Sequence, residues 1–209
     1  MIAIVNYGMG NITSVMNALE AIGAAATIAN EPNQLAHADG IILPGVGAFG
    51  DGMAQLWHRG FIPSLEREVL AREKPLLGIC LGLQLLATTG NEHGRHAGLG
   101  WIPGEVTRIE SPADQATLRL PHVGWNDVHR THDSALYAGI APGQSFYFVH
   151  SFVLNPTDLS VITGVFDYGA RYVASIQWRN IYATQFHPEK SHKPGLALLK
   201  NFSDRVHHA

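Results

Sequence analysis

Apolar and polar positions divide the first half of the chain into short buried runs and longer amphipathic stretches. The apolar runs predict strands at 2–5, 24–29 and 40–43, and a further strand in the run that ends at Cys80. The amphipathic stretches predict helices at 12–22, 52–59, 63–72 and from 81 to about 89. Strands that alternate with helices are typical of an α/β protein whose central sheet is mainly parallel.

The pattern changes after Gly98, where strand-like segments follow one another at short spacing with turn residues between them. These segments are 104–110, 122–129, 146–153, 161–166, 172–178 and 181–186. Such spacing favours antiparallel additions to the sheet, and the apolar spacing of 193–206 predicts a closing helix. We expect one three-layer α/β domain over residues 1–209, with helices on both faces of a mainly parallel sheet.

Composition narrows the classes of function. The 209 residues are 46% hydrophobic with a net charge of -3, and this balance argues against nucleic acid or an anionic membrane as the main partner. No apolar run has the length of a membrane span, and the first residues lack the basic start of a signal peptide. The single cysteine forms no internal disulfide, so we expect a cytoplasmic protein.

The strongest chemical motif is the passage from a buried run through Gly78-Ile79-Cys80-Leu81-Gly82 into helical periodicity. A strand, a sharp turn and a helix with small residues around a nucleophile form a nucleophile elbow. The amides and dipole of the helix that begins after Cys80 favour a thiolate. The alternative is a buried structural cysteine, which is the commoner role of a lone cysteine.

A base and its orienting group lie in the segment His187-Pro188-Glu189. Pro188 favours an extended backbone at His187, so we expect the side chains of His187 and Glu189 to project to the same side at a strand end. An imidazole that removes a thiol proton, with a carboxylate that fixes its tautomer, completes a Cys-His-Glu triad with Cys80. An ordinary turn at a strand end is the alternative.

Glycine-rich loops follow two of the predicted strands. The loop Pro44-Gly45-Val46-Gly47-Ala48 presents backbone amides where open α/β sheets bind ligands, so it is a candidate oxyanion hole or else a tight turn. The loop after the first strand lacks the third glycine of a dinucleotide fingerprint, since Thr13 occupies that position.

Histidines are frequent, with 12 in the chain. The pairs His93/His96 and His129/His132 lie in polar, turn-rich sequence without completing cysteine or glutamate ligands. We therefore predict surface histidines and no metal site.

The motifs around Cys80 and His187 together resemble those of a known protein family. Gly78-Ile79-Cys80-Leu81-Gly82-Leu83-Gln84 together with Gln185-Phe186-His187-Pro188-Glu189 resembles the class I triad glutamine amidotransferases. Further segments narrow the resemblance to the glutaminase subunits of imidazole glycerol phosphate synthase, an enzyme of bacterial histidine biosynthesis. They are Pro44–Phe49, Pro121–Asn126, Tyr147–Ser151 and His187–Ser191.

The resemblance implies that Cys80 attacks the side-chain amide of glutamine, that His187 transfers the proton and that Glu189 orients the imidazole. No cofactor is implied. The oxyanion would be met by the amide of Leu81 and by one from the loop at Val46 and Gly47, where a peptide flip would act as a switch. Glutamine would be held by Gly47, Gln84, Glu92, Ser151 and Phe152. Ser151 and Phe152 stand where some relatives have Thr and Tyr, so only their backbone contacts carry over.

The resemblance also implies a partner. Ammonia released into water would be protonated and lost, so the glutaminase would form a heterodimer with a cyclase subunit, a (β/α)8 barrel. Four residues match positions expected at that junction: Asn11, Trp125, Tyr147 and Lys190. Trp125 and Tyr147 are equally compatible with a place in the core.

Three other functions compete with this one. A sister glutaminase subunit would supply anthranilate, aminodeoxychorismate or pyridoxal phosphate synthesis. A cysteine hydrolase on a related fold would act without a partner. A regulatory subunit without activity is disfavoured because Cys80, His187 and Glu189 are all present.

Overall fold

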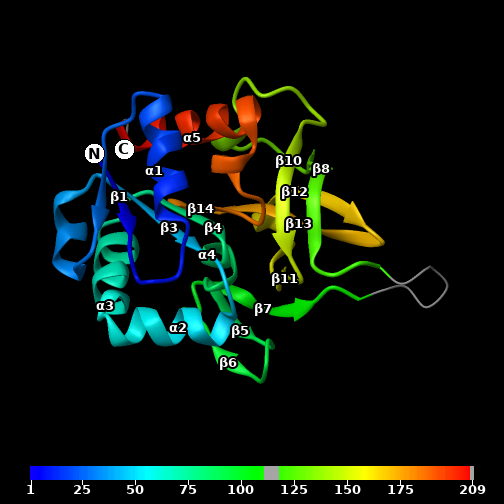
Figure 1. Ribbon diagram of the computed structural model, residues 1–209, viewed down its shortest axis with the longest axis horizontal. Helices are drawn as coiled ribbons and strands as arrows, with labels where there is room; N and C mark the ends of the chain where they lie inside the picture. Colours follow the sequence, from blue (N-terminus) through cyan, green and yellow to red (C-terminus); the bar gives the residue numbers. More distant parts are fainter. Residues whose placement is uncertain (111–117, 208–209) are drawn as a thin grey trace.

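The computed structural model describes residues 1–110 and 118–207, and its centre is a sheet of eight strands (Figure 1). The sheet order is β2-β1-β3-β4-β14-β13-β12-β9. The first five of these strands run parallel, and β13, β12 and β9 continue the sheet in antiparallel pairing. The strands are β1 Ile2–Val5, β2 Ala26–Ala29, β3 Gly40–Gly45, β4 Leu76–Cys80, β9 His129–Arg130, β12 Ile162–Tyr168, β13 Ala170–Trp178 and β14 Ile181–Thr184.

Helices cover both faces of this sheet, which confirms the predicted α/β architecture (Figure 1). On one face, apolar side chains of α1 and α5 pack with Ile2 and Ile4. On the other face, α2 and α3 pack with Ala3 and Val5. Alternate residues of β1 therefore enter opposite cores, as expected for a strand buried on both sides. The helices are α1 Ile12–Ala21, α2 Phe49–His58, α3 Phe61–Leu65, α4 Leu81–Gln84 and α5 His192–His207.

Two smaller sheets lie beside the main sheet, where β8 contacts β12 and β11 contacts β13. One has the order β11-β7-β5-β6, and the other is the antiparallel pair β10-β8. Their strands are β5 Ala87–Gly90, β6 His96–Ala97, β7 Ile102–Arg108, β8 His122–Asp127, β10 Ser145–His150 and β11 Phe152–Pro156. The prediction that the second half adds antiparallel strands to the main sheet is thus correct for β9, β12 and β13. β14 also joins the main sheet but runs parallel to its neighbour β4, and the other strands form separate sheets.

The predicted helix from 81 to about 89 is wrong, because α4 ends at Gln84 and β5 begins at Ala87. The carbonyl groups that would continue the helix are bonded elsewhere: that of Leu85 accepts from the amide of Leu99, and that of Ala87 accepts from Gly100. The loop at residues 99–100 therefore occupies carbonyl groups that a longer helix would need as acceptors. No residue close to Gln84 in the sequence indicates that the helix ends there.

The predicted strand 146–153 is also wrong as a single strand. The chain leaves its pairing with β8 after His150 and resumes as β11, which pairs with β7. Ser151 lies at the crossing, where its carbonyl accepts from the amide of Ile109. Likewise the predicted strand 122–129 ends at Asp127, and β9 begins two residues later.

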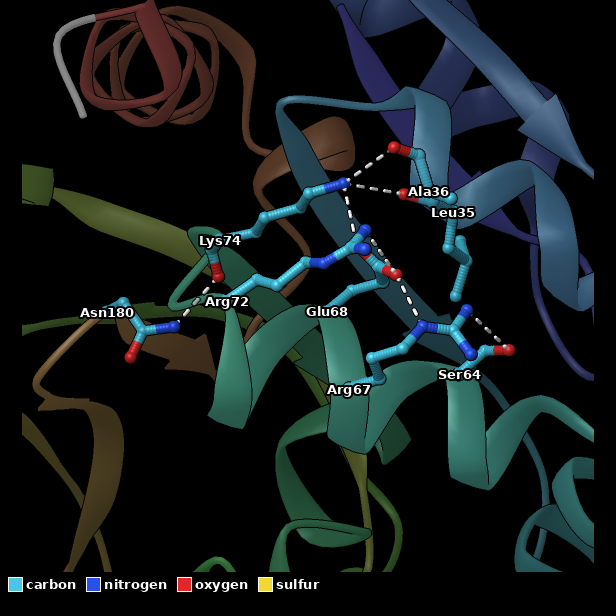
Figure 2. A network of polar contacts seen from close by, with 8 residues as sticks. All are labelled: Leu35, Ala36, Ser64, Arg67, Glu68, Arg72, Lys74 and Asn180. Atoms are coloured by element: carbon cyan, nitrogen blue, oxygen red, sulfur yellow. Dashed lines mark hydrogen bonds and ion pairs between the residues drawn. The ribbon is translucent and has the colours of Figure 1, made fainter.

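The segment predicted as helix 63–72 begins at Phe61 and changes at Glu66 into a π-helical turn, Glu66–Ala71. Figure 2 shows that the Glu68 carboxylate on this turn contacts the cationic groups of Arg67, Arg72 and Lys74. Lys74 also donates to two carbonyl groups of the 3₁₀ helix Pro32–His37. The network ties the segment before β4 to its neighbours. The other early helix, predicted at 52–59, begins three residues sooner, at Phe49.

Within residues 1–110 and 118–207, no helix is long and apolar enough to span a membrane. The same residues contain no group of three or more His, Cys, Asp or Glu side chains that could hold a metal ion.

Candidate functional site

Cys80 occupies the tight turn between β4 and α4. Its backbone has φ 55° and ψ -107°, a strained conformation for a residue with a side chain. Gly82 makes the turn possible, since a Cβ there would stand 1.8 Å from the carbonyl oxygen of Leu43. The predicted elbow is therefore confirmed as a conformation. The helix after it is only four residues long, so its dipole is smaller than the sequence suggests.

Sheet order brings three segments to the same edge. Gly45 lies opposite Cys80 in the β3–β4 pair, and Thr184 lies opposite Ile79 in the β4–β14 pair. The loop after β3, the elbow after β4 and the segment after β14 consequently meet at the carboxyl end of the parallel strands. Ligands of open α/β sheets bind at this end.

His187 and Glu189 form a buried pair next to the elbow. The distance from His187 Nδ1 to Glu189 Oε1 is 2.7 Å, and each side chain is 2% exposed. The expected pairing is found, although not on an extended strand: residues 188–190 form a 3₁₀ helix that turns the carboxylate back to the ring. The His187 amide donates to the carbonyl of Tyr147, which fixes the backbone that carries the imidazole.

The imidazole of His187 is electrostatically coupled to the Cys80 sulfur. Burial disfavours the imidazolium, but the Cys80 sulfur and the Glu189 carboxylate outweigh burial and raise the pKa of His187 to about 10. Among the described residues, its Nε2 has no hydrogen-bond partner. The free nitrogen is the one that a proton-transfer role requires, because Nδ1 is held by Glu189.

A pocket of about 620 Å³ opens beside Cys80. Nine of the predicted residues line it: Val46, Gly47, Cys80, Leu81, Gln84, Glu92, Ser151, Phe152 and Lys190. The loop residue Val46 is 39% exposed, and Gly47 has φ +103°, which is disfavoured for residues with a side chain. The pocket is large enough for an amino acid.

Two of the predicted glutamine ligands have partners within the protein. A carboxylate oxygen of Glu92 accepts from the amide of Phe49 at the start of α2, at 2.9 Å. The side-chain nitrogen of Gln84 donates to the carbonyl of Phe152 at 2.9 Å. Both contacts hold walls of the pocket in place.

The four predicted junction residues lie on the described surface or close to it. Trp125 is 47% exposed, so it is not a core residue, and its ring stacks on His192 and meets Tyr147 edge-on. The ammonium group of Lys190 lies 5.9 Å from the centre of the Tyr147 ring. Asn11 accepts from the amide of Ser14 and caps α1, a structural role that any partner contact would add to.

Sequence reasoning missed three buried polar residues around the pocket. Gln185 donates to the Cys80 sulfur at 3.7 Å, and His150 lines the pocket and contacts His122 at 3.3 Å between ring nitrogens. Burial lowers the pKa of His122 to about 4 and that of His150 to about 3. The signal for Gln185 was its place next to Phe186-His187, directly after the buried strand that begins at Ile181.

Comparison with known proteins shows which family the chain matches. The family described as glutamine amidotransferase class-I matches residues 3–206. The imidazole glycerol phosphate synthase subunit HisH of Moorella thermoacetica is 48% identical over 208 residues, covering 100% of this chain and 96% of its own. The subunit of the same name from Aquifex aeolicus is 44% identical over 204 residues, covering 97% of this chain and 96% of its own.

Solved structures share the fold at much lower identity. One described as a glutamine amidotransferase has a TM-score of 0.75 and 18% identity, covering 99% of this chain and 100% of its own. The structure of PurLQS from Thermotoga maritima has a TM-score of 0.74 and 17% identity, covering 98% of each chain.

Proposed function

The chain belongs to the class I glutamine amidotransferase family, and from this premise we propose which of its residues carry the reaction. Its function is that of the glutaminase subunit of imidazole glycerol phosphate synthase in histidine biosynthesis, in line with the HisH relatives at 44–48% identity over nearly its full length. The main support for the site proposal is the buried His187–Glu189 pair, coupled electrostatically to Cys80.

In the proposed reaction, the Cys80 sulfur attacks the side-chain carbonyl carbon of glutamine. His187 takes the thiol proton and returns it to the leaving nitrogen, so the C–N bond breaks and ammonia departs. A γ-glutamyl thioester remains on the sulfur, and water hydrolyses it to glutamate. Glu189 holds Nδ1 of the imidazole and so keeps Nε2 for the proton transfers.

The oxyanion that forms during attack needs donors near the sulfur. We assign the backbone amide of Leu81 and one from the loop of Val46 and Gly47, each typically contributing about 3 kcal/mol. Gly45 lies opposite Cys80 across the β3–β4 pair, which supports this loop as the second source. A flip of the peptide near Val46 is our proposed switch, and flanking glycines make it sterically cheap.

Glutamine binding is assigned to Gly47, Gln84, Glu92, Ser151 and Phe152. All five line the pocket beside Cys80. The Glu92 carboxylate suits the amino group of the substrate, and the Ser151–Phe152 backbone forms part of the opposite wall. We also propose that residues 1–209 act as one glutaminase domain without a cofactor.

The HisH relatives are named as subunits, so a partner subunit completes the enzyme. We propose a cyclase with a (β/α)8 barrel that receives the ammonia, in a cytoplasmic heterodimer. Asn11, Trp125, Tyr147 and Lys190 are our candidates for the contact. The exposed side chains of Val123 and Trp125 on β8 support this assignment, because an uncovered aromatic and aliphatic pair suits a protein interface.

The test is the variant Cys80→Ser in the complex reconstituted with the cyclase. We expect glutamine-dependent synthesis to be lost while synthesis from added ammonia persists, since only the amide-splitting step needs the sulfur. Retained glutamine use would remove Cys80 from the role of nucleophile.

The glutaminase activity of the isolated chain distinguishes the proposed subunit from the remaining alternative, a cysteine hydrolase that acts without a partner. A glutaminase that serves a synthase is expected to turn over slowly alone and to accelerate when the cyclase is added. Robust unstimulated turnover would instead favour an independent hydrolase.

A further inference from the structure

A line of buried amides joins the pocket wall to the nucleophile. We propose that Gln185 is a positioning residue for Cys80: its side-chain amide directs an N–H group at the sulfur and favours the thiolate. The inference rests on the proposed role of Cys80 as nucleophile and adds to it a donor outside the triad.

Three distances define this line of amides. Gln185 Nε2 lies 3.7 Å from the Cys80 sulfur. Gln185 Oε1 lies 3.0 Å from Gln84 Nε2, which in turn lies 2.9 Å from the carbonyl oxygen of Phe152. Gln185 is fully buried and Gln84 is 5% exposed, so both amides depend on these partners rather than on water.

The orientation of both side-chain amides follows from the Phe152 carbonyl, at the end of the line away from the sulfur. A backbone carbonyl only accepts hydrogen bonds, so the group of Gln84 that faces Phe152 is its nitrogen. This nitrogen also donates to Gln185, whose oxygen must therefore face Gln84. The nitrogen of Gln185 is left to face the sulfur. In the flipped orientation, Gln185 would set nitrogen against nitrogen at one end and oxygen against sulfur at the other.

A second donor fixes the Phe152 carbonyl. The ring nitrogen Nδ1 of His150 lies 2.9 Å from the same oxygen, and its Nε2 faces Nδ1 of His122 at 3.3 Å. A ring nitrogen that faces a carbonyl carries the proton, so His150 donates from Nδ1 and accepts at Nε2. The carbonyl that directs the line is thus held from two sides.

The surroundings of the sulfur give this donor a chemical role. The Cys80 thiol donates to the carbonyl of Val149 at 3.9 Å, and this acceptor favours the protonated form. The N–H of Gln185 favours the thiolate, because hydrogen bonds donated to the charged form stabilise it. The imidazolium of His187 supplies positive charge near the sulfur, and Gln185 supplies a hydrogen-bond donor of fixed orientation.

Cys80 is the single cysteine of the chain, so a thiol reagent reports on this site alone. The experiment measures the rate of alkylation by iodoacetamide as a function of pH in the full chain. In Gln185→Met, which keeps the length and apolar bulk but removes the amide, we expect the midpoint of the pH–rate profile to rise by about one unit. The rate at high pH, where the thiolate forms in both proteins, should stay within about twofold.

The matched control is Gln177→Met on β13, whose amide oxygen accepts from Ser134 away from the sulfur. Its midpoint should equal that of the unmodified chain. An unchanged midpoint in folded Gln185→Met would overturn the proposal, as would an equal rise in the control.

A second variant covers the case in which Gln185→Met does not fold. Gln84→Met removes the partner that orients Gln185 and should raise the midpoint by less than Gln185→Met would. No rise in folded Gln84→Met would contradict the proposed line. The alkylation assay needs no glutamine turnover, so its failure is distinct from failure of the nucleophile role, which Cys80→Ser tests separately.

Discussion

Removing the charge of Glu68 should destabilise the protein by an amount that depends on pH. The carboxylate side chain is fully buried and contacts Arg67, Arg72 and Lys74 at distances of 2.8, 3.0 and 2.8 Å (Figure 2). Burial opposes ionisation, but the three cations more than offset it and lower the pKa of Glu68 from 4.5 to about 2. The variant Glu68→Gln keeps the size of the side chain and removes only the charge.

The magnitude follows from proton linkage. A fall in pKa from 4.5 to about 2 corresponds to about 3 kcal/mol at neutral pH, at about 1.4 kcal/mol for each tenfold change in proton affinity. The side chains of Arg67 and Arg72 are 49% and 54% exposed, so solvent screening reduces the expected loss to about 2 kcal/mol. After the substitution both arginines can reach water, which limits the cost of leaving them unpaired.

The sign of the pH dependence is fixed by the lowered pKa. The stabilisation is complete above the unfolded value of 4.5 and is lost as pH falls through about 2. Near pH 3 it should be roughly half of its neutral value. Urea unfolding of both proteins near pH 7 and near pH 3 measures the difference directly.

The control is Glu66→Gln on the same π-helical turn, where the carboxylate is exposed and a change within about 0.5 kcal/mol is expected. A loss in Glu68→Gln that is the same near pH 7 and near pH 3 would refute the electrostatic reasoning and leave only a packing effect.

Four further predictions concern the site. Glu189→Gln should lower kcat for glutamine hydrolysis by about 10²- to 10⁴-fold with little change in KM, because it releases the imidazole that it orients; steady-state kinetics of the complex would show otherwise if only KM changed. Lys190→Ala should uncouple glutamine hydrolysis from synthase turnover without lowering thermal stability, and an unchanged ratio of glutamate to product would count against it. His122 and His150 stay neutral in the folded protein because burial lowers their pKa values to about 4 and about 3. Stability should therefore fall by about 1 kcal/mol per histidine between about pH 7 and pH 5.5; urea unfolding of His122→Gln should show a smaller fall, and an identical fall would contradict the assignment. Gly82→Ala should cost about 3 kcal/mol or more, measured by thermal unfolding, since its Cβ would overlap the backbone of β3; a stable, active variant would show that the elbow has room.

Much of the fold could be predicted because its signals are local. The run Ile2–Val5 is apolar at every position and forms a strand buried on both faces. The elbow was visible because glycines flank Cys80 and a buried run precedes it. In the same way, Pro188 and the spacing of His187 and Glu189 pointed to a paired base and carboxylate, although the 3₁₀ turn that joins them was not foreseen.

Other elements depended on partners that the sequence does not name. The helix after Cys80 is cut short because the loop at Leu99 and Gly100 takes its acceptors. The chain from β10 to β11 looks like one strand, yet it divides at Ser151 because its two halves find different neighbours. Backbone hydrogen bonds between distant segments carry no local signature, so propensity and periodicity cannot detect them.

The amino-acid sequence by itself determined which residues are the candidates for the chemistry, since a cysteine in a glycine-flanked turn and a histidine followed by a proline and a carboxylate are local patterns. Only the tertiary structure decided that they meet. The order β3-β4-β14 sets the loop at Gly45, the sulfur of Cys80 and the segment with Gln185 and His187 at one edge of the sheet. Strand order is chosen by the burial of whole faces, which is a property of the folded chain and of no single segment.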